Sequence, residues 1–280
     1  MTEPGTLHVV ATPIGNLDDL SPRAREVLGT VDRIACEDTR HTGRLLQRFG
    51  VRASLISVHE HNEEQRIGPL LELLREGGSV ALVSDAGTPL LSDPGFPLVR
   101  AALRDGIRVS PIPGPCAAVA ALSVAGLPPE PFRFLGFPSR RKRARREKLQ
   151  ALANVPDTLV WYESVHRLAA TLADLAAAFG GDRPAFVGRE LTKRHEQTRA
   201  GTLAELADWA GSDPDARRGE AVIVVGGSDG GPQGGGGLDL DRLLRALAKR
   251  LPPGEAAAVA AEATGEKRNQ LYRRILQLAE

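Results

Sequence analysis

Residues 7–16 read LHVVATPIGN. The mainly apolar start of this stretch ends at a threonine, a proline and a glycine, which predicts a buried strand that leads into a loop. Ser21 and Pro22 then supply an N-cap and a proline at the first helical position, so we expect a helix after the loop. The same rhythm recurs, with strands expected at 31–36, 54–58, 80–84 and 108–112 and helices at 39–49, 62–75 and 96–104. Strands that alternate with helices predict an α/β fold, with a mostly parallel sheet and helices on both faces.

A second set of strands and helices follows the proline-rich segment 126–131. Strands are expected at 132–137, 158–162, 185–188 and 221–225, and helices at 145–153, 167–179 and 203–210. We therefore expect an N-terminal α/β domain at 1–113, a second α/β domain at 114–227, a glycine-rich linker at 228–237 and a helical tail at 238–280. The tail has leucines at helical spacing and further helices on either side of Gly265, a helix-turn-helix-like pattern. Such a tail either packs as an appendage or contacts nucleic acid.

The composition is that of a globular protein without a strong overall charge. The 280 residues include 36 Lys and Arg against 35 Asp and Glu, a net charge of +1, which excludes the basic field of a small nucleic-acid-binding module. Cys36 and Cys116 lie far apart and have no partners at zinc spacing, so neither a disulfide framework nor a cysteine-rich metal site is expected. No apolar run approaches the roughly 18 residues that span a bilayer, and no signal peptide is recognisable. We expect a cytoplasmic protein with no membrane contact.

Three loops of small residues are expected at the carboxyl edge of the first sheet. They are residues 12–16, residues 84–89 (SDAGTP) and residues 113–117 (PGPCA). Ligands bind at this edge of open α/β sheets, although an ordinary turn also explains any one of the loops. The first loop has a single glycine, so the dinucleotide fingerprint and the phosphate-binding P-loop are both missing. The three loops together predict a ligand pocket that is not built for NAD or ATP.

Polar clusters follow several of the expected strands. Residues 37–40 and 59–63 should face the same edge as the loops, although Asn62 also suits a helix cap. His59 and His61 are not spaced like helical metal ligands, so no metal is expected. In the second domain, residues 161–167 and 188–196 are dense in groups that can exchange protons. Surface ion pairs, such as Glu190 with Lys193, are the simpler alternative for them.

Residues 140–148 concentrate positive charge. Seven of these nine residues are basic and one is acidic, a net charge of +6 where the whole chain has +1. A charged run is often only a solvated surface, but so dense a block favours contact with a polyanion, because each phosphate contact gains from counterion release. Aromatic residues make up only 4% of the chain, so contacts to phosphate and sugar are favoured over base stacking. We expect RNA contacts from the basic residues listed here: Arg40, Arg140, Arg141, Lys142, Arg143, Arg145, Arg146, Lys267 and Arg268.

In this order and spacing, these segments resemble the tetrapyrrole methylase superfamily. The strings that carry the resemblance are VATPIGNLDDLSPRA, CEDTRHTGRLL, HEHNE, VSDAGTPLLSDPG, PIPGPCA, FLGFPSRRKRAR, YESVHR, GRELTKRHE, GEAVIVVGG and, in the tail, GEKRNQLYRRIL. Within the superfamily they resemble the branch that 2′-O-methylates the ribose of a cytidine in 16S rRNA. Each string alone is weak, whereas their order and spacing together are specific.

The resemblance implies a two-domain tetrapyrrole methylase fold, S-adenosylmethionine as cofactor and a homodimer that acts on 16S rRNA of the small ribosomal subunit. The residues that it implies for cofactor binding are Pro13, Ala86, Gly87, Thr88, Leu91, Asp93, Cys116, Ala117, Glu163, Leu191 and Ala221. Cys116 stands where the family often has Ser or Thr, which a backbone contact would survive and a hydroxyl contact would not.

Transfer of a methyl group to a ribose oxygen requires alignment and the removal of a poorly acidic proton. We take His61, Glu37, Glu190 and Lys193 as candidates to deprotonate or orient the 2′-hydroxyl, because of their expected place at the rim. Two other functions remain open: methylation of a tetrapyrrole precursor, and a non-catalytic RNA-binding role in ribosome assembly. The basic block favours RNA over a tetrapyrrole.

Overall fold

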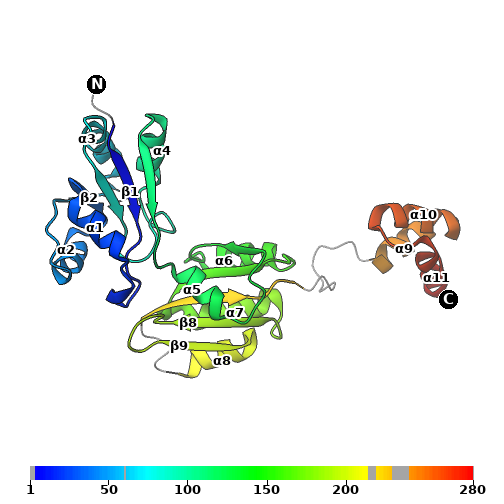
Figure 1. Cartoon of the computed structure of the whole chain (residues 1–280). Helices are drawn as coiled ribbons and strands as arrows, with labels where there is room; N and C mark the ends of the chain where they lie inside the picture. The colour runs from blue at the N-terminus through cyan, green and yellow to red at the C-terminus, as the bar shows by residue number, and fades with distance from the viewer. Residues whose placement is uncertain (1–3, 60, 214–218, 229–239, 280) are drawn as a thin grey trace. The chain divides into compact units, whose positions relative to one another are not determined.

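The computed structural model describes residues 4–59, 61–213, 219–228 and 240–279 (Figure 1). By its contacts the chain divides into two compact units, Met1–Ser228 and Asp229–Glu280. The expected glycine-rich linker at 228–237 lies, apart from its first residue, outside the described residues. No helix among the described residues is both long enough and apolar enough to cross a membrane.

The first sheet is parallel throughout, as the alternating sequence pattern predicts. Its strands are β1 (Thr6–Val10), β2 (Arg33–Cys36), β3 (Leu55–Ser57), β4 (Val80–Val83) and β5 (Arg108–Ile112), in the order β3-β2-β4-β1-β5. Each neighbouring pair is parallel. The carboxyl ends of all five strands therefore lie at one edge, which is where the three small-residue loops begin.

Helices cover both faces of this sheet. They are α1 (Pro22–Thr30), α2 (Thr39–Arg48), α3 (Glu63–Arg75) and α4 (Phe96–Arg104), with a short 3₁₀ turn, η1, at Leu17–Asp19. Successive residues of β4 point to opposite faces: Val80 and Leu82 pack into one core cluster with α3 and α4, and Ala81 and Val83 into the other with α1 and α2. A strand buried on both faces is the reason why β4 is a continuous apolar run.

The second sheet is mixed. Its strands are β6 (Phe132–Phe134), β7 (Thr158–Ser164), β8 (Pro184–Arg189), β9 (Gln197–Thr202) and β10 (Glu220–Val225), in the order β6-β7-β10-β8-β9. Only β6 and β7 pair in parallel, and the other pairs are antiparallel. The sequence pattern did not predict β9, because QTRAGT is polar and lies at the sheet edge, where no apolar alternation is required.

Helices also cover both faces of the second sheet. On one face, α6 (Lys142–Leu152), α7 (Val165–Phe179) and α8 (Leu203–Ser212) contribute to one large apolar cluster. On the other face, α5 (Ala117–Val124) packs its alanines against Val160 and Val222. Because α5 directly follows β5, the segment 113–117 connects the first sheet to a helix that packs on the second sheet (Figure 1).

The C-terminal unit is a three-helix cluster with its own core. Its helices are α9 (Leu240–Ala248), α10 (Pro253–Thr264) and α11 (Arg268–Ala279). Leu244, Ala257 and Ile275 are buried where the three helices meet. Gly265 ends α10 in the left-handed conformation, with φ of 74°, which provides the expected break before the last helix.

Candidate active site

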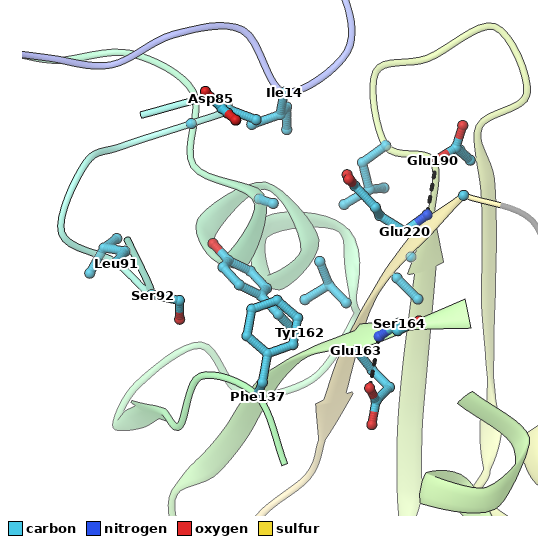
Figure 2. A pocket seen from close by; sticks show the side chains of 18 of the residues that line it. Ile14, Asp85, Leu91, Ser92, Phe137, Tyr162, Glu163, Ser164, Glu190 and Glu220 are labelled. Carbon is cyan, nitrogen blue, oxygen red and sulfur yellow. Dashed lines mark hydrogen bonds between the residues drawn. The ribbon is translucent and has the colours of Figure 1, made fainter. Parts of the chain in front are cut away.

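A single pocket, here called the main pocket, gathers the loops of the first sheet and the strand ends of the second. Its cavity volume of about 470 Å³ is in the usual range for small-molecule sites. The lining consists of Ile14, Asp85, Ala86, Gly87, Thr88, Leu91, Ser92, Asp93, Ala117, Phe137, Tyr162, Glu163, Ser164, Gly188, Glu190, Leu191, Lys193, Gly219, Glu220, Ala221 and Val222 (Figure 2).

Hydrogen bonds join the three small-residue loops into one wall of the main pocket. The backbones of Thr12 and Gly87 exchange two bonds, of 2.9 and 3.0 Å, and the Thr12 hydroxyl donates to the Ser84 carbonyl at 3.1 Å. The Thr88 hydroxyl donates to the Pro115 carbonyl at 3.0 Å. Gly87 has φ of +82°, and a Cβ there would lie 3.2 Å from Ile14 Cγ2. Glycine therefore allows both the backbone conformation and the close approach of the first loop.

The same wall carries carboxylates. Burial raises the pKa of Asp93 to about 6; the charges of Glu37 and Asp85 raise it too, against a hydrogen bond with the Ser84 side chain. Leu90 and Ser92, which precede Asp93, both have φ of 73°, a strained conformation for residues with side chains. A backbone held in this way presents a carboxylate of perturbed pKa to the pocket, an arrangement common at functional sites.

Two aromatic rings form part of the floor. The Tyr162 hydroxyl accepts a hydrogen bond from the Ala118 backbone at 3.2 Å and lies 3.9 Å from Cys116 Sγ. Burial raises the pKa of Tyr162, so the phenol stays neutral. The ring of Phe137, which is 56% exposed, meets Tyr162 edge to face at 5.7 Å between centroids. The floor therefore offers an accessible aromatic surface to a planar ligand group.

Glu163, a residue expected to bind cofactor, uses its carboxylate within the protein. Its oxygens accept hydrogen bonds from the Ser164 backbone at 2.7 Å, from Arg167 at 2.5 Å and from the Thr171 hydroxyl at 2.6 Å. Figure 2 shows the side chain directed away from the other lining residues. Because Glu163 is almost fully buried, only its backbone is free to meet a ligand.

Glu190 and Lys193, two catalytic candidates, form an ion pair at the opposite wall. Lys193 Nζ lies 2.9 Å from Glu190 and 3.3 Å from Glu220. Glu190 also accepts a hydrogen bond from the Glu220 backbone N–H at 3.0 Å (Figure 2). Burial alone would raise the pKa of Glu190, but the hydrogen bonds from Lys193 and from the Glu220 backbone lower it. Burial would lower the pKa of Lys193, yet its bond to Glu190 and the charge of Glu220 raise it. Both groups therefore stay charged near neutrality, which makes Glu190 a weak proton acceptor and leaves Lys193, already protonated, with no site to accept a proton.

Most of the predicted cofactor residues come together in the main pocket, whereas two lie outside its lining. Those in the lining are Ala86, Gly87, Thr88, Leu91, Asp93, Ala117, Glu163, Leu191 and Ala221. Pro13 is buried, and Cys116 is half-buried beside Tyr162. The catalytic candidates His61 and Glu37 also lie outside the lining; His61 is exposed and contacts the ring of His59 at 6.0 Å between centroids.

Sequence reasoning missed several of the pocket's side chains. Asp85, Phe137, Tyr162 and Glu220 line the pocket although none was singled out as a site residue. Asp85 lay within a quoted loop, and its place directly after a strand was a usable signal. Phe137 carried no comparable signal, because the edge-to-face contact with Tyr162 joins positions far apart in the chain.

The basic block divides into exposed and buried residues. Arg140, Arg141 and Lys142 are exposed. Arg145, by contrast, has a side chain only 7% exposed, and it pairs with buried Asp174 at 2.6 Å. The expectation that Arg145 contacts RNA is therefore corrected: its guanidinium anchors α6 to α7.

The remaining expected RNA residues lie at the surface. Arg143 pairs with Glu147 on its own helix at 2.8 Å, and Arg146 remains 55% exposed while bonding Asp174. Arg40 is 85% exposed beside Asp38, and Lys267 and Arg268 are exposed in the C-terminal unit. All five residues offer charge to solvent.

Comparisons with known proteins agree with this architecture. The family model of Tetrapyrrole (Corrin/Porphyrin) Methylases matches residues 6–207, and that of the RsmI C-terminal HTH domain matches residues 235–279. Among solved structures, a cobalt precorrin-4 methyltransferase superposes with a TM-score of 0.59 at 20% identity, covering 79% of this chain and 94% of that one. A uroporphyrin-III-C-methyltransferase from Thermus thermophilus gives 0.56 at 26% identity, with coverage of 79% and 94%.

Full-length relatives are much more similar. Ribosomal RNA small subunit methyltransferase I of Pseudomonas aeruginosa is 52% identical over 275 residues, which covers 98% of this chain and 97% of that protein. The protein of the same name from Escherichia coli O157:H7 is 48% identical over 275 residues, with coverage of 98% and 95%. The chain thus belongs to the tetrapyrrole methylase family and, within it, to the group of ribosomal RNA small subunit methyltransferase I.

Proposed function

We propose that this protein transfers a methyl group from S-adenosylmethionine to the ribose 2′-hydroxyl of one cytidine in 16S rRNA of the small ribosomal subunit. The observation that carries the proposal is the 52% identity, over 98% of the chain, to a protein named as a methyltransferase of small-subunit ribosomal RNA. The choice of cytidine and of the 2′-oxygen rests on the resemblance of the sequence motifs to the branch of the family that methylates this position. The cytoplasm, where ribosomal subunits are found, remains the expected location.

The main pocket fits S-adenosylmethionine in size and in charge. When bound, this cofactor supplies a methyl group already activated by a sulfonium cation. Asp85 and Asp93 provide negative charge on the wall built by the 84–93 loop, and Gly87 lets the backbone approach closely. The accessible face of Phe137 suits the flat adenine ring. The residues present therefore match both the charged and the planar parts of the molecule.

The protein's part in the reaction is mainly to bind and align the two substrates. Methyl transfer from a sulfonium needs no metal, and holding the reacting atoms in line supplies a large share of the rate. We propose that the Lys193–Glu190 pair, fixed at the opposite wall, orients the acceptor ribose. His61 and Glu37, outside the pocket lining, would act only on an acceptor that extends beyond it.

For contact with RNA we propose the exposed cations of the basic block and of the C-terminal unit. Arg140, Arg141 and Lys142 are exposed at the start of α6, and Lys267 and Arg268 at the start of α11. Such residues bind phosphate without reading sequence, so they would position a large structured RNA.

A homodimer is also part of the proposal. Val119 and Val124 on α5 are 55% and 57% exposed, and Phe132, eight residues after Val124, is 42% exposed. Large apolar side chains at the surface are candidate positions for an interface between two copies of the chain. Sedimentation or light scattering of the pure protein would show a dimer if this inference holds, and a monomer would refute it.

The test is transfer of radiolabelled methyl from S-adenosylmethionine to three acceptors: 30S subunits that lack the modification, naked 16S rRNA and uroporphyrinogen. We expect label at one ribose of the RNA, located by mapping the labelled nucleotide. Label on uroporphyrinogen alone would overturn the choice of acceptor. Tight cofactor binding without transfer to any acceptor would instead favour a non-catalytic role.

Alanine variants of His61, Glu37, Glu190 and Lys193 would separate proton transfer from alignment under single-turnover conditions. The rate of the wild type should fall with decreasing pH. If the rate of one variant does not, the side chain removed in that variant is the base. Unchanged rates in all four variants would exclude a proton acceptor among them and the orienting role of the Lys193–Glu190 pair, and would leave positioning by other residues.

A further inference from the structure

A second hollow, here called the side pocket, adjoins the main pocket and has a volume of about 670 Å³. Both pockets are lined by Lys193, and the chain passes from one to the other between Ile14 and Gly15 and again between Leu191 and Thr192. The two loops that contain these steps therefore form the boundary between the pockets.

That boundary is tightly packed. The Asn16 backbone N–H donates to the Thr192 hydroxyl at 3.1 Å, and a Cβ on Gly15 would lie 2.3 Å from Lys193 Cγ. Glu190 and Thr192 hold positive φ of 51° and 66°, conformations that residues with side chains seldom adopt. Such conformations persist only where the surrounding contacts hold the backbone in place. The boundary is therefore rigid, and the two pockets keep a fixed spacing.

The two pockets differ in the sign of their charge. Among the residues that the structure describes, the lining of the main pocket has one cation, Lys193, against five carboxylates: Asp85, Asp93, Glu163, Glu190 and Glu220. Even with Glu163 paired to Arg167, negative charge prevails. A neutral ribose hydroxyl can enter such a pocket, whereas a phosphodiester is repelled by it. The phosphates that flank an acceptor ribose must therefore find cations nearby.

The side pocket supplies those cations. Counted over the described residues, its lining has Arg48, Lys193 and Arg194 against the single carboxylate of Asp18. Arg48, in the last turn of α2, and Arg194 are both exposed, and neither forms a salt bridge with another residue within the described parts of the chain. Two guanidinium groups without carboxylate partners are suited to bidentate contact with phosphate.

The side pocket also has apolar surface. Leu17 is 38% exposed, and Phe49 is half-buried with the Arg25 guanidinium 5.8 Å from its ring centroid. Apolar side chains next to cations suit a nucleotide. Its phosphate is anionic, whereas the flat face of its base and the C–H side of its sugar are apolar surfaces. A free inorganic anion would make no use of this surface.

We propose that the side pocket binds the phosphodiester and sugar of the RNA nucleotide next to the one whose ribose enters the main pocket. Arg48 and Arg194 hold the phosphate, and Leu17 and Phe49 contact the sugar or base. The inference rests on the proposed function, since it assigns a subsite to the same RNA substrate. It explains how a negatively charged pocket receives a substrate that is itself a polyanion.

The experiment compares Arg48→Ala, Arg194→Ala and the double variant with the wild type. Binding to 30S subunits that lack the modification is measured over a range of salt concentrations, and cofactor affinity is measured separately by calorimetry. The slope of log K against log salt is negative, and each lost phosphate contact reduces its magnitude by about 0.7. Because both arginines hold the same phosphate, we expect the double variant to reduce the magnitude by about 0.7 and each single variant to reduce it by less, with unchanged cofactor affinity.

Arg104→Ala is the matched control, because Arg104 is also an exposed arginine in the last turn of a helix of the first sheet and lines neither pocket. Arg48→Lys should restore most of the slope, since it keeps the charge. Thermal melting shows that each variant is folded.

The outcomes separate this inference from the proposed function. If the wild type methylates the subunits while the double variant binds them with the wild-type slope, the side pocket is not an RNA subsite. If the variants lose cofactor affinity instead, the side pocket belongs to the cofactor site and the inference is overturned. If the wild type methylates no RNA at all, the proposed function itself has failed.

Discussion

The pKa of Asp93 makes cofactor binding depend on pH, and Asp93→Asn is the perturbation that tests it. With a pKa of about 6, this carboxyl is about one tenth ionised at pH 5 and about nine tenths ionised at pH 7. A sulfonium cation in the main pocket favours the ionised form, so binding should strengthen as the pH rises through 6.

The magnitude follows from linkage. If the cation returned the pKa of Asp93 from about 6 to its ordinary value of 3.8, affinity at pH 7 would exceed that at pH 5 about tenfold. Because the carboxyl is only partly buried, solvent screening reduces the effect, and we expect roughly three- to tenfold.

The measurement is the binding affinity, by calorimetry at both pH values, of S-adenosylmethionine and of its product S-adenosylhomocysteine. The sulfur of the product is a thioether and carries no charge. We expect the pH dependence for the first ligand and little for the second. Asp93→Asn should remove it, since the amide cannot ionise. Equal pH dependence for the two ligands, or its persistence in Asp93→Asn, would refute the reasoning.

The same carboxyl affects stability without any ligand. A folded-state pKa above the ordinary value means that the folded protein favours the protonated carboxyl, so the stability that this provides is complete below pH 3.8 and is lost as the pH rises through 6. Without ligand, Asp93→Asn should therefore melt at a higher temperature than the wild type at pH 7.5 and at nearly the same temperature at pH 4. A lower melting temperature at pH 7.5 would contradict this.

Three further predictions follow from other parts of the chain. Asp174→Ala leaves Arg145 buried without its partner, so the free energy of unfolding should fall by roughly 3–5 kcal/mol in urea melts, whereas Arg143→Ala, at an exposed pair, should leave it nearly unchanged. Gly87→Ala forces a side chain into a left-handed backbone at a cost of about 1–2 kcal/mol, and calorimetry should show weaker cofactor binding. Removal of residues 229–280, a unit with its own core, should leave cofactor affinity intact while weakening binding to small subunits; equal subunit binding would show that the tail makes no RNA contact.

The sequence predicted the first sheet well because its signal is local. A strand buried on both faces, such as β4, is an unbroken apolar run, and its alternation with helices implies parallel pairing. The edge strand β9 gave no such signal, since its QTRAGT sequence has no buried residue: three are exposed and three are half-buried. Antiparallel pairing in the second sheet depends on which strands become neighbours, and no local pattern encodes that.

The candidate site was predictable where it lies on loops after strands. The three loops predicted a ligand pocket, the family resemblance implied residues 86–88 and Asp93 for it, and the structure brings these residues to one pocket. The basic block was harder, because a run of like charges hides which members face inward. Arg145 stands four residues before buried Leu149, on the same face of α6, and this helical spacing was the available sign that it is buried.

The charge of the main pocket bears on the choice between the two enzymatic functions. A tetrapyrrole precursor carries several carboxylates, and a site that accepts it needs cations close to the reacting atom. Within the described part of the chain, the only cation in this lining is Lys193, which is already paired with Glu190 and Glu220. A ribose hydroxyl is neutral, and the phosphates of its nucleotide lie away from the reacting oxygen. The same lining therefore admits the hydroxyl without charge repulsion. The acidic pocket and the basic surfaces outside it are therefore two parts of one arrangement, which favours a nucleic acid acceptor over a polycarboxylate.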